Sequence, residues 1–277
     1  MRRILLNLFA FALAANAFCA NGLDVLLREI NSAWQTNSLV ALCLCDKAVA
    51  EFPTNTQALT VRARVLDGLR RYDDAIRDFS SALKLETNSA PLWQGRGEMN
   101  FKTGHFRESV TDFDRVIELS PAQAPHHWQR GISLYYAERF SDGRKQFEWH
   151  QTVNPNDVEN AAWHFLCAAR ERGITNARAT MIEVGPDARV PMKQIYALYR
   201  GTGSVEEVLS AAAQSIGNAR QRDALFYAHL YLGLYFDALG DSKKAREHIG
   251  KAASDFGAAH YMGDVARVHF RKLNATR

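Results

Sequence analysis

A repeat with a period of 34 residues is the feature that most constrains the fold of this chain. Reading every thirty-fourth position aligns aromatic, aliphatic and small residues in successive columns: Tyr72, Phe106, Phe140; Phe79, Phe113, Phe147; Leu85, Leu119, Val153; and Ala63, Gly97, Gly131. A unit this short cannot bury its own apolar face, so neighbouring units must stack on one another. The period therefore predicts a solenoid built from repeated helical units.

Each unit is expected to be a pair of antiparallel helices. In the clearest unit Gly104 ends the first helix and Pro121 stops the second. Small residues at Gly97 and Ser109 let the two helix axes approach closely. Only 7 Pro and 17 Gly occur in 277 residues, too few for the frequent turns of an all-β fold. We expect an all-α, right-handed solenoid of about ten to thirteen helices.

In its columns as well as its period the sequence resembles the tetratricopeptide repeat (TPR) family. The resemblance is specific over residues 56–157 and predicts four units over 22–157, the first of them degenerate. Residues 158–277 are expected to form divergent TPR-like helices, with one clearer repeat at 226–257 and a C-terminal capping helix from Tyr261 to Leu273. In this family the first helices line a concave groove that binds peptides.

The second half also resembles NlpI-type proteins, which are bacterial envelope TPR lipoproteins. The segments that carry this likeness keep the same order and similar spacing: Leu134-Tyr135-Tyr136, Asn154-Pro155-Asn156-Asp157, the helix around Trp163, Ile195 to Gly201, and Tyr231 to Asp241. The likeness consists of packing residues and turns and covers roughly residues 130–260. It implies a homodimerising adaptor that brings cell-wall hydrolases and a processing protease together.

The first 17 residues have the pattern of a secretory signal peptide. Arg2 and Arg3 precede an apolar segment of about a dozen residues, and Ala15-Asn16-Ala17 is a small-x-small cleavage pattern. The apolar segment is shorter than the ~20 residues that a membrane anchor needs. The sequence predicts an exported, periplasmic protein. A lipid anchor at Cys19 is the less favoured alternative, because the preceding Phe18 is larger than a lipobox accepts.

Patterns for nucleic-acid binding, metal binding and catalysis are absent from the sequence. The formal charge of +4 falls to +2 when Arg2 and Arg3 leave with the signal peptide, and no run of Lys and Arg could neutralise phosphates. The nine His residues show no HExxH spacing, and no CxxC motif occurs. We expect no cofactor, no metal and no nucleic-acid partner. Cys43, Cys45 and Cys167 are expected to be buried small hydrophobic residues rather than disulfide partners.

A peptide-binding groove is predicted on two adjacent first helices. Its six residues form two trios with the same spacing of four and then three, so each trio shares one helical face: Gln94, Glu98, Phe101 and Trp128, Ile132, Tyr135. Aromatic residues in such a groove are typical binding hot spots. The alternative is that Trp128 packs in the core as Trp93 does, because His127 occupies the equivalent column.

These observations favour an exported, non-enzymatic scaffold that mediates protein–protein interactions in the cell envelope. The alternative is a cell-wall hydrolase or other enzyme using the divergent region 158–225, but that region contains no nucleophile elbow, paired carboxylates or metal spacing. A third possibility is self-association as the main role.

Overall fold

A computed structural model describes residues 22–275, which form helices joined by loops and contain no β-strand. The all-α solenoid of helix pairs is confirmed. The described range contains fifteen α-helices and one 3-10 helix, more than the ten to thirteen expected, because short helices also occupy the predicted connections. The predicted signal peptide and Cys19 lie outside the described residues. None of the helices described is both long and apolar enough to cross a bilayer.

The chain forms two compact units, with the boundary in the sequence between Met99 and Asn100. The first unit contains a helix over residues 22–36 and the following helices: α2 (Ser38–Glu51), α3 (Thr56–Gly68), α4 (Tyr72–Leu85) and most of α5 (Ala90–Thr103). The boundary between the two units therefore falls inside helix α5 and not in a loop. The predicted division into 34-residue repeats, with its change at residue 157, stays a prediction.

Small residues and side-chain caps shape the first unit. Asn37 caps α2 by accepting hydrogen bonds from the backbone N–H groups of Leu39 and Val40, at 3.1 and 3.3 Å. Cys45 and Ala63 are fully buried where helices pack closely, as the small-residue columns predict. The prediction that Cys43 is also buried is wrong, since Cys43 is exposed. It lies two positions from Cys45 and therefore on a different face of α2.

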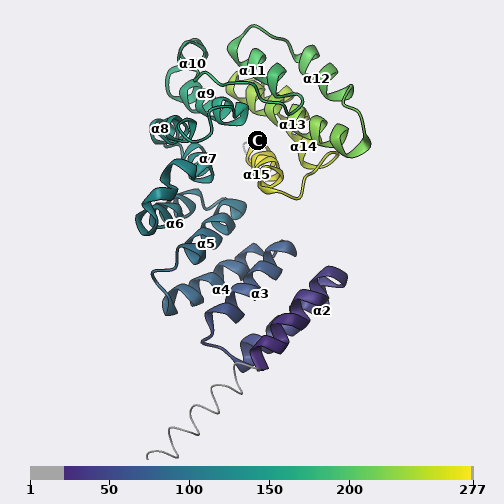
Figure 1. Cartoon of the computed structure of the whole chain (residues 1–277). Helices are drawn as coiled ribbons and strands as arrows, with labels where there is room; N and C mark the ends of the chain where they lie inside the picture. Colours follow the sequence, from purple (N-terminus) through teal and green to yellow (C-terminus); the bar gives the residue numbers. More distant parts are fainter. Residues whose placement is uncertain (1–21, 276–277) are drawn as a thin grey trace, which may run out of the picture. The chain divides into compact units, whose positions relative to one another are not determined.

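The second unit continues from the end of α5 through the rest of the described chain (Figure 1). Its elements in order are α6 (Phe106–Leu119), η1 (Pro121–His126), α7 (Trp128–Tyr136), α8 (Phe140–Gln151), α9 (Val158–Arg172), α10 (Ile174–Thr180), α11 (Met192–Arg200), α12 (Val205–Ala213), α13 (Asn218–Ala238), α14 (Ser242–Ala253) and α15 (Tyr261–Ala275). Consecutive helices pack as pairs, including α7 with α8 and α13 with α14. Gly104 and Gly240 have φ of 91° and 80°, the left-handed conformation expected of residues that end a helix.

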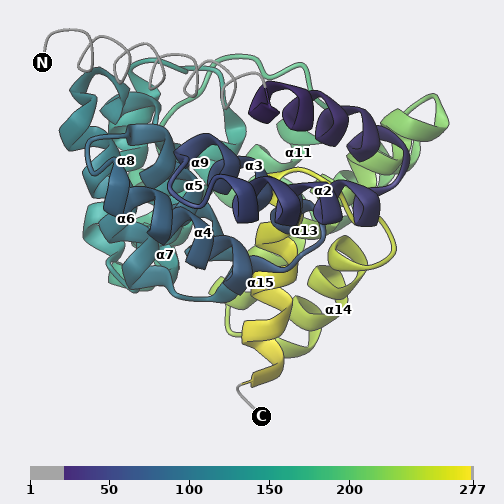
Figure 2. The ribbon, with the colours of Figure 1, turned by 90° about the horizontal axis from the view of Figure 1, so that it is seen from below.

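The last helix, α15, has neighbours at both ends of the second unit. Figures 1 and 2 both show α15 beside α14, as expected for a capping helix. It also contacts α7, because the ring of Tyr261 lies edge-on to that of Trp128 at 5.1 Å and His269 Nδ1 lies 3.0 Å from the Tyr136 hydroxyl. An ion pair at 3.4 Å joins Lys102 to Asp264. Within the second unit, helix α15 therefore covers one face of α7 and the C-terminal end of α5.

The small-residue column has a direct steric basis at Gly131. A Cβ atom at this position would lie 2.6 Å from the ring of Phe147, whereas one at Gly250 would lie 3.3 Å from the ring of Phe270. Both glycines are helical, so alanine gains about 1 kcal/mol of helix propensity at either site. We expect Gly131→Ala to lower the free energy of unfolding by about 1 kcal/mol or more through overpacking. Gly250→Ala, the matched control, should be neutral or stabilising in urea unfolding, and equal results for the two variants would contradict the steric explanation.

Candidate functional site

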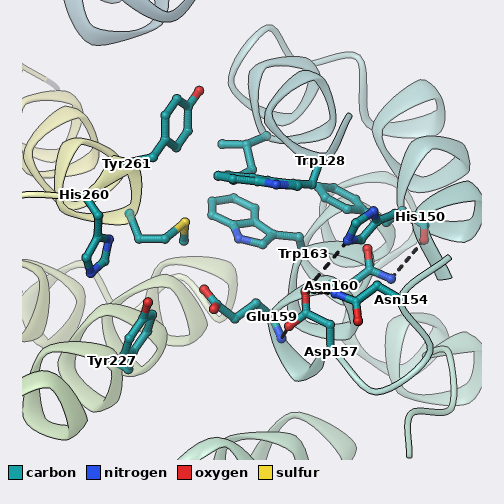
Figure 3. A pocket seen from close by; sticks show the side chains of 13 residues that line it. Trp128, His150, Asn154, Asp157, Glu159, Asn160, Trp163, Tyr227, His260 and Tyr261 are labelled. Atoms are coloured by element: carbon teal, nitrogen blue, oxygen red, sulfur yellow. Dashed lines mark hydrogen bonds and ion pairs between the residues drawn. The ribbon is translucent and has the colours of Figure 1, made fainter. Parts of the chain in front are cut away.

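The second unit contains a cavity of about 350 Å³ between α7, the end of α8, the start of α9, and the segments around residues 227 and 261 (Figure 3). Aromatic, aliphatic and polar side chains share its lining: Trp128, Ile132, Phe147, His150, Asn154, Asp157, Glu159, Asn160, Trp163, Tyr227, His260, Tyr261 and Met262. Its volume is that of a ligand pocket. Because α13 and α15 supply one side, the cavity exists only when the beginning and the end of this unit come together.

Rings form the apolar walls of the cavity. Trp128 and Trp163 lie one above the other in Figure 3, and Trp163 stacks on Phe147 with a 6.4 Å centroid separation and a 20° interplanar angle. On the opposite side His260 stacks on Tyr227 at 5.8 Å and 16°. Trp128 is only partly buried, whereas Trp163 is 2% exposed. The cavity therefore offers partly exposed aromatic area on a rigid support.

Carboxylates line one edge of the cavity. Asp157 begins α9 as its N-cap and accepts a hydrogen bond from the Glu159 backbone N–H at 3.1 Å. The Arg189 guanidinium, from the loop before α11, forms ion pairs with Asp157 at 2.7 Å, with Asp187 at 2.6 Å and with Glu159. Tyr231 donates its hydroxyl hydrogen bond to Glu159 Oε2 at 2.7 Å. The loop is thus attached to α9 through one guanidinium.

Burial and charge act in opposite directions on these carboxyls. Burial raises the pKa of Glu159, and the neighbouring Arg189 only partly opposes this effect. For Asp187 burial also favours the neutral acid, but hydrogen bonds from Arg189 outweigh it and lower the pKa.

Two buried polar atoms of lining residues have no hydrogen-bond partner in the protein. They are Oδ1 of Asn160 and Nε1 of Trp163, and each residue is 2% exposed. The other amide atom of Asn160 is satisfied, since Nδ2 donates to the Phe147 carbonyl at 3.0 Å and to Gln151 Oε1 at 3.2 Å. A buried unpaired donor or acceptor costs about 1–3 kcal/mol. Each such group in a native protein calls for an explanation, and a bound water, ion or other ligand is one of those available.

Metal ligation has no geometric support in the described range. No group of three or more His, Cys, Asp and Glu side chains between residues 22 and 275 is arranged to hold a metal ion. The closest pair of imidazoles, His229 and His248, has Nδ1 atoms 2.8 Å apart and is enclosed by the rings of Phe256 and Phe236. A direct hydrogen bond between the two rings explains this pair.

Comparison with known proteins gives a consistent answer for the architecture. No family model matches the sequence. A TPR protein from Parabacteroides merdae ATCC 43184 superimposes with a TM-score of 0.60 at 14% identity, over 92% of this chain and 99% of that chain. The chain has the tetratricopeptide repeat fold.

Two further TPR-like structures superimpose with lower scores. PilW, described as a widely conserved type IV pilus biogenesis factor, matches with a TM-score of 0.51 at 16% identity, over 88% of this chain and 97% of that one. MamA from Desulfovibrio magneticus RS-1 matches with a TM-score of 0.52 at 15% identity, over 57% and 89%. The resemblance to NlpI-type proteins stays a prediction.

The six residues of the predicted TPR groove lie in three different environments. Gln94 and Glu98 belong to the first unit, are partly exposed, and share a 2.8 Å hydrogen bond along α5. Phe101 and Tyr135 are buried, at 0% and 2% exposure. Trp128 and Ile132 line the cavity, although Ile132 itself is 1% exposed. Peptide binding by these six residues stays a prediction, and Trp128 is the member that both lines the cavity and is partly exposed.

Packing of α15 on Phe101 and of α9 on Tyr135 explains why these two side chains are buried. Phe101 stacks on Tyr261 of α15 at 5.2 Å, and the Tyr135 hydroxyl accepts a hydrogen bond from Arg170 Nε at 3.3 Å. His127 is packed in the core, against Phe113 at 4.7 Å, and Trp128 is partly buried, packs against the hydrophobic core and also lines the cavity, so both interpretations of Trp128 stay predictions.

Sequence reasoning missed most of the cavity. In the sequence Asp157 stands out only as the end of the segment Asn154-Pro155-Asn156-Asp157, and no motif singles out Glu159. Arg189, Tyr227 and Tyr261 come from segments whose distance from α9 in the sequence hides their proximity. The one local signal in the sequence is a pair of acidic residues, Asp157 and Glu159, at the start of a helix that is otherwise largely buried.

Proposed function

We propose that this protein is an exported, non-enzymatic scaffold that binds a protein or peptide partner at the cavity of its second unit. The observation that carries the proposal is the partly exposed ring of Trp128, fixed against Tyr261 at the mouth of a preformed aromatic cavity. Tryptophan and tyrosine held in this way dominate binding energy at protein interfaces. The TPR fold supports the same role, since PilW, which shares it, is described as a pilus biogenesis factor.

The bacterial cell envelope is the proposed location. The signal-like segment over residues 1–17 supports export to the periplasm, and the resemblance to NlpI-type proteins suggests cell-wall hydrolases or a processing protease as partners. We retain lipidation of Cys19 as the less favoured alternative to a freely diffusing protein. Homodimer formation belongs to the same proposal and is measured by light scattering on the purified protein.

A site-specific photocrosslinking experiment tests the proposal. Benzoylphenylalanine at position 128 places the crosslinker at the cavity, and the same residue at position 149 serves as a control because Trp149 is 51% exposed on α8 and does not line the cavity. Irradiation of intact cells followed by mass spectrometry should recover a protein partner from position 128 only. Recovery of the same proteins from both positions, or from neither, counts against the cavity as the binding site.

Trp128→Ala is expected to weaken partner binding by about 2 kcal/mol or more, which is roughly a 30-fold change in Kd. Some folding stability should also be lost, because the ring contacts Tyr261. Affinity for the crosslinked partner and the thermal midpoint are measured on the same variant. Reduced stability with unchanged affinity at low temperature would show that Trp128 is a packing residue only.

The enzyme alternative has one observation in its favour. Glu159 is a buried carboxyl with a raised pKa beside a second carboxyl, Asp157, as in many glycosidases. Arg189, however, bridges the two carboxylates, whereas glycoside hydrolysis requires them to flank the substrate. We expect no release of reducing ends from purified peptidoglycan. Release that disappears in Glu159→Gln would favour the enzyme instead.

A further inference from the structure

One wall of the cavity has an excess of negative charge. Asp157 and Glu159 line the cavity, and both form ion pairs with Arg189, which also pairs with Asp187 outside the lining, so three carboxylates share one guanidinium. The His150 imidazole, which also lines the cavity, lies 3.9 Å from Asp157. The cluster carries a net charge of −2 when all three are ionised and −1 when Glu159 is protonated. In either state a positively charged ligand is attracted to this wall.

The opposite walls suit a cation as well. Figure 3 shows the Glu159 carboxylate pointing into the space bordered by Trp163 and Tyr227, with His260 and Tyr261 on the far side. The faces of aromatic rings attract cations, with Trp the most effective. A carboxylate on one side and aromatic rings on the others is the arrangement of an ammonium-binding cage.

We propose that the cavity receives a lysine side chain of the bound partner, an inference that rests on the proposed scaffold function and specifies which partner segment is selected. Lysine fits better than arginine because both Glu159 oxygens already accept hydrogen bonds, Oε1 from Arg189 and Oε2 from Tyr231. The contact through two parallel hydrogen bonds that a guanidinium prefers to make with a carboxylate is therefore already taken at Glu159. A compact ammonium needs only a single free lone pair and the surrounding charge.

The unpaired polar atoms are a second, independent indication of a peptide ligand. Asn160 Oδ1 can accept and Trp163 Nε1 can donate, and neither has a partner in the free protein. A lysine residue brings an ammonium group together with its own backbone N–H and C=O, which are the donor and acceptor types that these two residues lack. A neutral apolar ligand would leave both groups unsatisfied.

The test compares three peptides that differ at one side chain. The sequence Ac-Ala-Gly-X-Gly-Ala-amide, with X as lysine, norleucine or arginine, is titrated into the purified full chain while the tryptophan indole N–H signals are followed by NMR. Signals of Trp128 and Trp163, assigned with Trp128→Phe and Trp163→Phe, should shift with the lysine peptide. Norleucine removes the charge but keeps the alkyl chain, and we expect it to bind at least tenfold more weakly.

Variants that remove one negative charge test whether the lysine peptide binds at the carboxylate wall of the cavity. Glu159→Gln should weaken the lysine peptide about tenfold and leave the norleucine peptide unchanged. Asp157→Asn is the second variant, since asparagine keeps the N-cap of α9 while removing a charge; about a threefold loss is expected. Glu118→Gln, an exposed glutamate paired with Arg115 on α6, is the matched control and should have no effect. Raising NaCl from 20 to 500 mM should weaken binding of the lysine peptide and leave the uncharged norleucine peptide unchanged.

The possible results separate this inference from the proposed function. Stronger binding of lysine than of norleucine, reduced by Glu159→Gln, supports both. Equal or stronger binding of norleucine overturns the lysine assignment but leaves the cavity as a site for protein segments, and preference for arginine overturns the choice of ammonium. A photocrosslinked partner at position 128 combined with binding of none of the three peptides also overturns the lysine assignment, while no partner and no peptide overturn both.

Discussion

Trp163→Ala is expected to lower the free energy of unfolding by about 3–5 kcal/mol, the range for removing a large aromatic side chain from a core. The indole is 2% exposed and packs against three rings. Its centroid lies 5.4 Å from that of Tyr135, 6.2 Å from that of Tyr136 and 6.4 Å from that of Phe147. Truncation therefore leaves a void bordered by α7, α8 and α9 at once. Urea unfolding followed by far-UV circular dichroism gives the change directly.

Trp149→Ala is the matched control for this variant. It makes the same chemical change on α8, but Trp149 is 51% exposed. We expect its free energy of unfolding to stay within about 0.5 kcal/mol of that of the unmodified protein. Similar losses for both variants would mean that the ring cluster around Trp163 contributes nothing beyond an ordinary surface tryptophan.

Acidification from pH 7 to pH 5 is expected to lower stability by about 2 kcal/mol through His127 alone. Burial lowers the pKa of His127 to about 4, and the adjacent Arg130 acts in the same direction. Its Nδ1 accepts a hydrogen bond from the Arg130 backbone N–H at the start of α7, so the folded state requires the neutral ring. Below pH 6.5 the unfolded chain binds a proton that the folded chain does not, and stability therefore falls as the pH falls towards 4.

The variant His127→Asn isolates this contribution. Asparagine caps a helix well and does not titrate, so stability at pH 7 should fall through lost contact with Phe113 while its pH dependence becomes shallower. His126→Asn is the control, because His126 is the exposed neighbour at the same helix start. Urea midpoints of each protein at pH 7 and pH 5 provide the comparison. An unchanged slope in His127→Asn would assign the acid sensitivity to other groups.

Local patterns in the sequence predicted the architecture of this molecule. The columns at Phe113 and Phe147 are buried in the structure, and Gly131 is small because the ring of Phe147 occupies the space beside it. The contacts made by these residues join neighbouring helices, and they recur with the period of the repeat. Repeats reveal such contacts because each unit packs mainly on its neighbours.

The cavity could not be predicted in this way because its contacts do not follow the period. Phe101 and Tyr135 were assigned to a groove from their positions on the first helices, yet α15 and Arg170 cover them. Arg189 joins α9 from a loop with no helical pattern of its own. The repeat columns left two orientations open for Trp128, and its contact with Tyr261 comes from a segment outside the period.

The position of α15 also determines when the cavity can form during biosynthesis. Trp128 and Trp163 are synthesised well before Tyr261, the residue that closes the opposite side. A nascent chain that has completed α9 can already pack α7, α8 and α9 together, but it exposes Phe101 and Tyr136 until α15 arrives. Contacts between such distant segments form slowly and leave apolar surface open in the meantime. The complete lining of the cavity therefore exists only in chains that have been synthesised through the start of α15.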